Sequence, residues 1–537
     1  MSEASSMSGP MSPNGLIGRV VAVAGSRVTV LLAAGDGHAV EVGSIARVHT
    51  NRSTAFGLVS SLRTGELPAG AGSAAPRLME LELLGECMRD AAGNEGAFLR
   101  GVSVLPTLDA EVRPATRADL ERVYAKPAAS TVRVGAVHQD RTIPAFVTTD
   151  QLVGKHFAVL GTSGSGKSCT VALLLRAILG QNPHGHVVLL DPHNEYRAAF
   201  GDRAEVLSPQ SVELPVWLLN FEETVELLLG RDGTQHEVEA GILKGAILDA
   251  KRRFVGEGRD TSYITVDTPV PYRMATLVQY LEKQMGRLDK PENSTPYLRL
   301  KDRIDTLSSD SRYNFMFQGM FVSDNMSGIL SRLLRIPVAG KPITIVDLSG
   351  VPSEIVEVLV SMISRMIFDF ALWSDRDRVV PVLLVCEEAH RYVPKGEAAF
   401  PSARAALARI AKEGRKYGVG LGLVTQRPSE LSPDVLSQCN TLFALRMSNL
   451  PDQEYVARTL PDSSGGLVST LPSLRTQEAV VVGEGVSVPV RLALDDLPEE
   501  FRPRSSSARF AEAWAADRTA ADFVGETVER WRRQQRD

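Results

Sequence analysis

The sequence predicts an α/β protein: a mostly parallel β-sheet flanked by helices, with a small β-barrel before it. Three observations support this prediction. After Asp140, short and nearly continuous runs of Val, Ile and Leu alternate with helical segments, as in strands buried on both faces of a sheet. Up to Val112, short strands with alternating polarity are separated by Gly- and Pro-rich turns. The chain has 537 residues, more than the roughly 250–300 that one hydrophobic core supports, so we expect two or three domains.

The N-terminal part begins with a predicted hairpin, Gly18–Ala24 and Arg27–Leu32, joined by a Gly-Ser turn. Further strands are expected at Ser44–Val48, Gly57–Ser60, Leu78–Leu84 and Arg100–Val104. Several short strands at this spacing are typical of a small β-barrel, which we place at residues 15–113. Residues 1–14, rich in Ser, Gly and Pro, are expected to be a disordered tail. An irregular β-rich linker is the alternative to the barrel.

The α/β part is predicted at residues 114–485, beginning with a connecting segment at Pro114–Asp140. Its strands are expected at His156–Leu160, His186–Leu190, Ile343–Leu348, Val379–Cys386, Val419–Val424 and Thr441–Leu445. A helical insertion, at about residues 215–341, is expected to contain Phe221–Leu229, Glu237–Phe254, Met274–Met285 and Tyr297–Leu307.

Residues 486–537 read as a strand, Val486–Leu492, and a helical tail. In this tail Val524, Val528 and Trp531 form one apolar stripe, which we expect to pack on a neighbouring subunit or on the chain's own core.

Composition and charge exclude several classes of protein. No apolar run reaches the roughly 18–20 residues that span a bilayer, and the N-terminus lacks the basic and apolar segments of a signal peptide. The four cysteines lie far apart with no CxxC, which favours neither a disulfide framework nor a zinc site. We therefore expect a cytoplasmic protein that does not contact membranes. The net charge of −5 argues against coating nucleic acid with the whole surface, but it permits a local basic groove or pore.

Residues 161–168, Gly-Thr-Ser-Gly-Ser-Gly-Lys-Ser, fit the phosphate-binding pattern G-x4-G-K-[ST]. They lie between a predicted strand and a predicted helix, Cys169–Leu179, as this pattern requires. The glycines let backbone N–H groups surround a phosphate at a helix N-terminus. Lys167 places a positive charge on the β- and γ-phosphate oxygens of a nucleotide, and the Ser168 hydroxyl coordinates Mg²⁺.

An apolar strand ends in two carboxylates, Glu387 and Glu388. In a P-loop ATPase such a strand supplies one acid to the Mg²⁺ shell and a second that orients the attacking water. Glu387 stands where Asp is usual, so its contact with Mg²⁺ is expected through water, and Glu388 is the candidate general base. Asp191 and Glu195 follow another strand and are candidates for holding Mg²⁺ waters or sensing the γ-phosphate; a plain turn is the alternative.

With these motifs placed, the chain resembles the bacterial HerA-like ATPases of the HerA/FtsK superfamily. The motifs that carry the resemblance are GTSGSGKS, DPHNEY, TIVDLSG, CEEAHRYVP, EGRKYGV, VTQRP and LSQCNT, in that order. The resemblance implies a RecA-like P-loop ATPase core with a HAS-like N-terminal barrel. It implies a homo-oligomer, usually a hexameric ring, that hydrolyses ATP with Mg²⁺ between subunits and moves along double-stranded DNA with a nuclease or other effector partner.

Further roles follow from this comparison. Gln426 follows the strand beside the acidic one, where a polar side chain can sense the γ-phosphate and hold the water. Arg415 is the first choice for an arginine finger acting on the neighbouring subunit, with Arg446 and Lys155 as weaker candidates and a solvated basic helix face as the alternative. The candidate catalytic residues are Lys167, Glu388, Glu387, Gln426 and Arg415. The candidate nucleotide-binding residues are Gly161, Thr162, Ser163, Gly164, Ser165, Gly166, Lys167, Ser168, Cys169, Asp191 and Glu195; Ser168 and Glu387 are the candidate Mg²⁺ ligands.

Three functions compete. The first is an ATP-driven translocase on double-stranded DNA, working in DNA end processing or antiphage defence. The second is an ATP-dependent scaffold that assembles and gates an effector, such as a NurA-type nuclease or a sirtuin-like NADase, without processive translocation. A small-molecule kinase or GTPase is disfavoured, because the sequence has no NKxD-like guanine motif. Lys251–Arg253 and Arg391–Lys395 are basic, but neither pattern is specific enough to name DNA contacts.

Overall fold

The computed structural model describes residues 15–33, 40–65, 75–209, 211, 214–230, 237–287, 294–317, 323–396, 401–459, 465–504, 510–515 and 522–532. The expected tail at 1–14 lies outside these residues. The chain forms two compact units. The first comprises Met1–Gln181, Thr425–Ser429 and Leu436–Leu497, and the second comprises Asn182–Val424, Glu430–Val435 and Pro498–Asp537.

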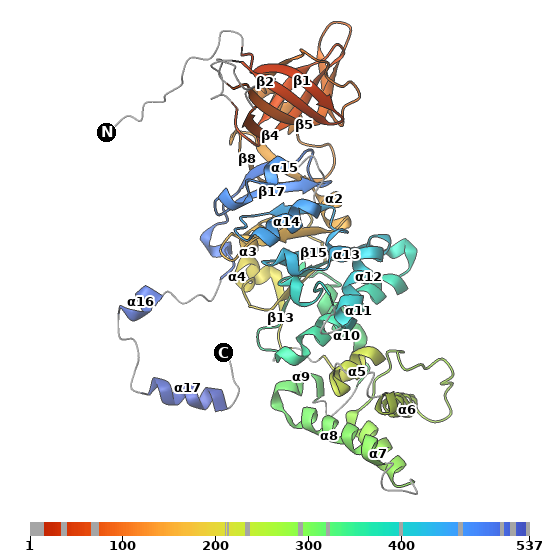
Figure 1. The fold of residues 1–537 in the computed structure, drawn as a ribbon. Coiled ribbons are helices and arrows are strands. Elements are labelled where there is room, and N and C mark those ends of the chain that lie inside the picture. Colours follow the sequence, from red (N-terminus) through yellow and green to blue (C-terminus); the bar gives the residue numbers. More distant parts are fainter. Residues whose placement is uncertain are drawn as a thin grey trace. The chain divides into compact units, whose positions relative to one another are not determined.

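The first unit begins with the predicted barrel (Figure 1, red and orange). Its strands are β1 (Gly18–Ala24), β2 (Arg27–Leu32), β3 (Ile45–His49), β4 (Ser53–Thr64), β5 (Arg77–Arg89), β6 (Glu95–Arg100) and β7 (Glu111–Pro114). They are paired in the order β2-β1-β7-β3-β4-β5-β6, and a further pairing of β2 with β5 closes the ring. Alternate residues such as Val28 and Val30 of β2 point into one apolar core, which is the polarity pattern visible in the sequence.

The strand expected at Arg100–Val104 is wrong. β6 ends at Arg100 because Gly101 takes a left-handed conformation (φ 89°), which a strand cannot continue through. The backbone N–H of Ser103 then donates to the carboxylate of Glu86 (2.7 Å) and not to a neighbouring strand.

The first unit also contains a mixed sheet. Its strands are β8 (Thr131–Val137), β9 (Pro144–Thr148), β10 (Phe157–Leu160), β16 (Thr441–Ala444), β17 (Glu478–Gly483) and β18 (Val490–Leu494), in the order β10-β16-β17-β18-β8-β9. β10 and β16 are parallel and the other pairs are antiparallel. The expected connecting segment at Pro114–Asp140 is therefore partly wrong, because it contains β8. The helices of this unit are α1 (Arg117–Val123), α2 (Thr149–Gly154), α3 (Lys167–Gln181), α14 (Leu450–Thr459) and α15 (Gly465–Val468).

The second unit contains the predicted parallel sheet. Its strands are β11 (Val187–Asp191), β12 (Ala204–Leu207), β13 (Ile343–Asp347), β14 (Val382–Cys386) and β15 (Val419–Thr425), in the order β12-β13-β11-β14-β15. All four pairings are parallel. Every residue of β11, β14 and β15 is buried, as the unbroken apolar runs in the sequence predict. β12 was not expected, since its four residues are too few to show a pattern.

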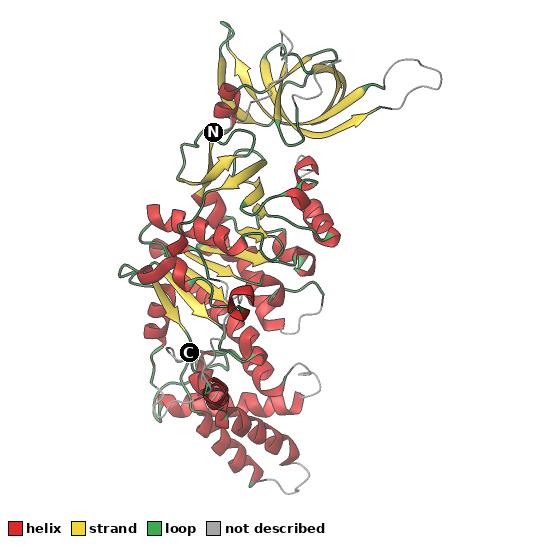
Figure 2. Ribbon diagram, turned by 90° about the vertical axis from the view of Figure 1, so that its left-hand side faces the viewer, coloured by secondary structure: helices red, strands yellow, loops and turns green. Residues whose placement is uncertain are grey.

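The expected helical insertion is present between β12 and β13. Its helices are α5 (Phe221–Leu229), α6 (Glu237–Val255), α7 (Met274–Met285), α8 (Thr295–Ser309), α9 (Asn314–Phe317) and α10 (Met326–Leu334). Figure 2 draws these segments as helices and loops, without a strand among the described residues. The other helices of the unit are α4 (Arg197–Phe200), α11 (Ser353–Trp373), α12 (Pro401–Tyr417), α13 (Pro433–Leu436), α16 (Phe510–Trp514) and α17 (Phe523–Arg532).

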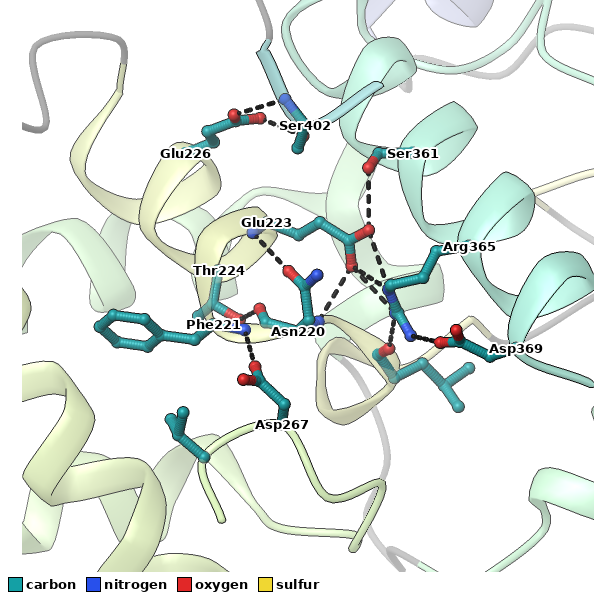
Figure 3. Close-up of polar contacts among 12 residues, drawn as sticks. Asn220, Phe221, Glu223, Thr224, Glu226, Asp267, Ser361, Arg365, Asp369 and Ser402 are labelled. Carbon is teal, nitrogen blue, oxygen red and sulfur yellow. Dashed lines mark hydrogen bonds and ion pairs between the residues drawn. The ribbon is translucent and has the colours of Figure 1, made fainter. Parts of the chain in front are cut away.

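A partly buried ion pair joins the insertion to α11 (Figure 3). Glu223 of α5 accepts hydrogen bonds from Arg365 (Nη2, 3.0 Å), from Ser361 (2.8 Å) and from the backbone N–H of Asn220 (2.9 Å). Three residues later Glu226 accepts from the N–H of Ser402, in the first turn of α12 (3.0 Å). One short helix of the insertion therefore contacts both α11 and α12 through carboxylates.

The apolar stripe of the C-terminal tail lies on α17, where Val524 and Trp531 are exposed and Val528 is half-buried. The exposed fraction is 70% for Val524 and 74% for Trp531, and α17 has no buried residue. Packing of this stripe onto the chain's own described core is therefore wrong, and packing on a neighbouring subunit stays a prediction. Across the described residues, no helix is both long and apolar enough to cross a membrane.

Candidate functional site

The glycine-rich loop at 161–168 joins β10 to α3, as its sequence predicts. Gly164 (φ 73°) and Gly166 (φ 102°) take left-handed conformations that curl the backbone. Two internal contacts fix the curve: the Ser165 hydroxyl donates to the carbonyl of Thr162 (2.7 Å), and the Thr162 N–H and hydroxyl both donate to the carbonyl of Arg446 (3.0 Å each). The loop is thus held by its own side chains and by the carbonyl of Arg446, which follows β16.

Gly161 has no room for a side chain. A Cβ at this position would lie 2.7 Å from Ser165 Oγ and 2.9 Å from Leu445 Cβ. Lys167 folds over the loop, and its Nζ donates to the Thr162 carbonyl (3.1 Å). The loop therefore presents a backbone cradle with one ammonium group above it, which fits a chain of phosphates.

Gln426 lies against this loop. Its side-chain oxygen accepts a hydrogen bond from the hydroxyl of Ser163, and the preceding Thr425 carbonyl accepts from the N–H of Gly161 (3.3 Å). Thr425 itself is buried, and its hydroxyl caps the following turn by accepting from Arg427 N–H (3.0 Å). Of the polar pair Thr425 and Gln426 at the end of β15, Gln426 is the residue whose side chain reaches the loop, as a γ-phosphate sensor would.

In the second unit, both acids at the end of β14 are nearly buried. Glu387 is 6% exposed, and its carboxylate accepts a hydrogen bond from the hydroxyl of Tyr196. Glu388 is 9% exposed and has a left-handed backbone (φ 52°, ψ 43°), so the chain turns sharply where the strand ends. A non-glycine residue in this conformation is unfavourable and is typical of functional sites.

The Glu388 carboxylate lies between two histidines. His193 Nε2 is 3.8 Å from Oε1 and His390 Nδ1 is 3.3 Å from Oε2. Oε2 is buried and accepts no hydrogen bond within the described part of the chain. A buried carboxylate oxygen with unused acceptor capacity can take a proton from water, which is the chemistry expected of a general base.

Asp191 is fully buried and organises the turn after β11. Its oxygens accept from the backbone N–H groups of His193 (3.2 Å) and Tyr196 (3.0 Å), and burial raises the pKa of its carboxyl group. These bonds support the plain-turn interpretation. Glu195, half-buried on the same turn, contributes its carbonyl to Arg504 N–H (2.9 Å). Nucleotide contacts by Asp191 and Glu195 stay predictions.

Residues 132–367 match the family model described as the central domain of helicase HerA. A probable DNA double-strand break repair helicase HerA of Methanocaldococcus jannaschii is 28% identical over 73% of this chain and 81% of its own length. The DNA double-strand break repair helicase HerA of Pyrococcus furiosus is 26% identical over 67% of this chain and 68% of its own. The chain is therefore similar to HerA helicases over 73% and 67% of its length in these two comparisons. VirB4 of Thermoanaerobacter pseudethanolicus has a similar fold (TM-score 0.50, 17% identity, 70% of this chain and 99% of that one).

The basic residues of α12 differ in their contacts. Arg409 stacks over the Phe368 ring (4.3 Å to its centroid), and Arg404 donates to the carbonyl of Gly396. Arg415 is exposed and has no side-chain partner within the described ranges. Lys155, a weaker finger candidate, forms an ion pair with Glu484 in its own unit.

Arg446, the other weaker candidate, supplies its carbonyl to the P-loop. Arg415 is therefore the arginine-finger candidate on α12, and its side chain has no partner among the described residues.

Two residues were missed from the sequence. Tyr196 ends the DPHNEY motif, and its fixed place five residues after Asp191 could have indicated a role. Gln477, the residue before β17, approaches the P-loop, and its N–H lies 3.4 Å from the carbonyl of Ser165. Nothing in the local sequence marks that contact.

The basic triplet Lys251–Arg253 is not wholly on the surface. Lys251 is 1% exposed, so its side chain cannot be a surface contact for DNA.

Proposed function

We propose that this chain is an ATP-driven ring motor that translocates on or remodels double-stranded DNA. The observation that carries the proposal is Glu388: a buried carboxylate at a sharp strand end, with one oxygen free of hydrogen bonds. The names of the curated relatives, which describe DNA double-strand break repair helicases, support DNA as the substrate on which the motor works.

In the proposed reaction, water attacks the γ-phosphoryl group of ATP and the bond to the β-phosphate oxygen breaks. Glu388 Oε2 accepts the proton of that water, and Gln426 orients the water from the side of the P-loop. Lys167 and the loop N–H groups hold the β- and γ-phosphate oxygens, so the charge that moves to the leaving oxygen is stabilised in place.

The residues present fit a Mg²⁺ ion. Ser168 follows Lys167 at the start of α3, where its hydroxyl can coordinate the ion beside the phosphates. Glu387 is held by the Tyr196 hydroxyl, so it would reach the ion through a water molecule. When bound, Mg²⁺ would neutralise charge on the β- and γ-phosphate oxygens.

An oligomer completes the proposed site. Arg415 is exposed and unoccupied, so it can reach across to the nucleotide of an adjacent subunit, as a closed ring of identical subunits allows. We further propose six subunits, a cytoplasmic location and an effector partner, either a NurA-type nuclease, another nuclease or a sirtuin-like NADase, in DNA end processing or antiphage defence.

The test is the ATPase rate of the full-length protein with and without linear duplex DNA, together with displacement of streptavidin from biotinylated duplex ends. Stimulation by duplex and ATP-dependent displacement are expected in the wild type, and Lys167→Ala is expected to abolish both. A rate unaffected by duplex, with no displacement, would contradict translocation. Suppose that a partner effector is active only when this protein is assembled, and yet stays active with the Glu388→Gln variant. That result would favour the scaffold function over the motor function.

A further inference from the structure

A turn before β17, Arg475–Glu478, lies directly against the P-loop within the first unit. The N–H of Gln477 points to the carbonyl of Ser165 (3.4 Å). A Cβ placed on Gly166 would lie 3.5 Å from that same nitrogen and 3.8 Å from Gln477 Cγ. Besides its contacts with Thr425, Leu445 and Arg446, the P-loop therefore has two glutamine neighbours in this unit. Gln426 contacts Ser163, and Gln477 covers Gly166, the residue before Lys167.

Gln477 holds an unfavourable backbone conformation at this contact. Its φ is 65°, in the left-handed region that a residue with a Cβ rarely adopts. The carbonyl of Gln477 is also fixed, because it accepts from the N–H of Leu494 in β18 (2.9 Å). Something beyond local preference must therefore hold this turn in place.

Glu478 supplies that restraint. It is 3% exposed, and four groups converge on its carboxylate. Arg491 Nη2 (2.8 Å) and the Arg475 N–H (3.2 Å) donate to Oε2, whereas Arg141 Nη2 and His138 Nδ1 each lie 3.5 Å from Oε1. The bond to Arg475 N–H closes the turn across Gln477, and the Arg491 and Arg141 contacts anchor it to β18 and to the segment between β8 and β9.

A structural role alone would explain the Arg491 contact, since β17 and β18 are paired strands. It does not explain why the carboxylate also bonds the turn's own backbone, or why that turn holds a left-handed Gln against Gly166. Gly166, whose φ is 102°, carries one of the N–H groups expected to face phosphate.

We propose that Glu478 is a positioning residue for ATP binding. Its carboxylate holds the Arg475–Glu478 turn so that Gln477 keeps the Ser165–Gly166 backbone in the conformation that receives the phosphates. The effect is on nucleotide affinity and not on the chemical step, because Glu478 is far in sequence from the acids at the end of β14 and contacts none of the proposed catalytic side chains. The proposal rests on ATP binding at the P-loop.

The test measures the Kd for a fluorescent ATP analogue and kcat at saturating ATP, in the full-length protein. Glu478→Gln is expected to raise Kd about tenfold and to leave kcat within about twofold. The matched control is Glu82→Gln in the barrel, because Glu82 is also 3% exposed and pairs with one arginine, Arg27 (3.1 Å). That variant should leave Kd unchanged.

The decisive variant is the double substitution Glu478→Gln with Gln477→Gly. Glycine adopts the left-handed conformation without strain, so it should restore Kd to within about threefold of the wild type. No restoration, or a Glu478→Gln protein that binds as tightly as the wild type, would overturn the proposal.

Two further variants extend the test: one replaces Glu478→Gln where that variant does not fold, and the other tests ATP binding at the P-loop separately. Where Glu478→Gln fails to fold, Arg141→Ala serves, since Arg141 is 61% exposed and its loss should raise Kd about two- to threefold. Lys167→Ala separates the two claims. If that variant binds the analogue like the wild type, ATP binding at the P-loop fails; if it does not bind while Glu478→Gln is unchanged, the positioning role fails.

Discussion

Glu223 and Glu388 are both buried glutamates of the second unit, and they differ in how their carboxylate oxygens are used. Glu223 is fully buried, and both its oxygens accept hydrogen bonds, from Arg365, Ser361 and Asn220. Glu388 is nearly as buried, yet its Oε2 accepts none within the described chain, and its backbone is left-handed.

The difference shows how burial of an acid should be interpreted. A buried carboxylate whose oxygens all accept hydrogen bonds from the protein has a structural role. Removing such a carboxylate leaves its partners unpaired in the interior. A carboxylate that the fold buries but leaves unfilled reserves that capacity for a substrate or a water molecule. Glu223 fastens the insertion to α11, whereas Glu388 is available for chemistry.

The largest expected effect comes from Glu388→Gln. Loss of the proposed general base should lower the hydrolysis rate by about 10²–10⁴-fold. The unfolding free energy should stay within about 1 kcal/mol of the wild type, since Oε2 accepts no hydrogen bond and only its contact with His390 (3.3 Å) is weakened. Single-turnover hydrolysis and urea unfolding measure the two quantities. Retained hydrolysis would show that Glu388 is not needed for chemistry, so its difference from Glu223 would have no functional meaning.

Glu223→Gln should show the opposite pattern. It leaves the partly buried Arg365 with Asp369 (3.4 Å) in place of two carboxylates, and it weakens the hydrogen bonds from Arg365 and Ser361, which should cost about 1–3 kcal/mol of unfolding free energy. The protein that remains folded at low temperature should hydrolyse ATP at a rate within about threefold of the wild type. Urea unfolding and the ATPase rate per folded molecule provide the check. An unchanged stability would show that the network in Figure 3 is not a structural tie.

The smallest effect is a pH dependence at Lys251. Its ammonium group donates to the carbonyls of Val266 (2.5 Å) and Thr268 (2.7 Å), near Tyr272, Asp267 and Arg365. Burial lowers its pKa from 10.5 to about 8. Between these values the unfolded chain binds a proton that the folded chain does not, so stability should rise with pH.

Comparison with Lys251→Met isolates this contribution. From pH 7.5 to pH 9.5 the unfolding free energy of the wild type should gain about 1–2 kcal/mol relative to that variant. Urea unfolding at both pH values measures the difference. Parallel pH profiles for the two proteins would show that Lys251 does not titrate in this range.

Much of the fold could be predicted because its signals are local. The buried strands are unbroken apolar runs, the P-loop has a fixed spacing, and Glu387 and Glu388 directly follow β14. β8 was assigned to the connecting segment, since its charged and small residues, Arg133 and Gly135, interrupt the apolar pattern.

The contacts of the site were harder to predict, because they join residues far apart in sequence. The bond from Tyr196 to Glu387 spans 191 positions, and the approach of Gln477 to the P-loop depends on a left-handed backbone that its sequence does not favour. Lys251 shows the converse error: it stands in a basic triplet, yet it faces inward on α6 together with Ile247. Sequence shows the charge of a residue and not the direction of its side chain.

In the proposed mechanism, a ring motor completes its ATP site with Arg415 from a neighbouring subunit, and Glu388 acts as the base. The most direct test mixes full-length Arg415→Ala and Glu388→Gln proteins and measures ATPase activity across all ratios. Each protein alone should be nearly inactive. At equal amounts, random assembly gives roughly one quarter of the interfaces an intact Glu388 and an intact Arg415, so activity should rise to a maximum there. Activity that stays at the level of the separate variants at every ratio, with mixed assembly verified by tagged subunits, would contradict the claim.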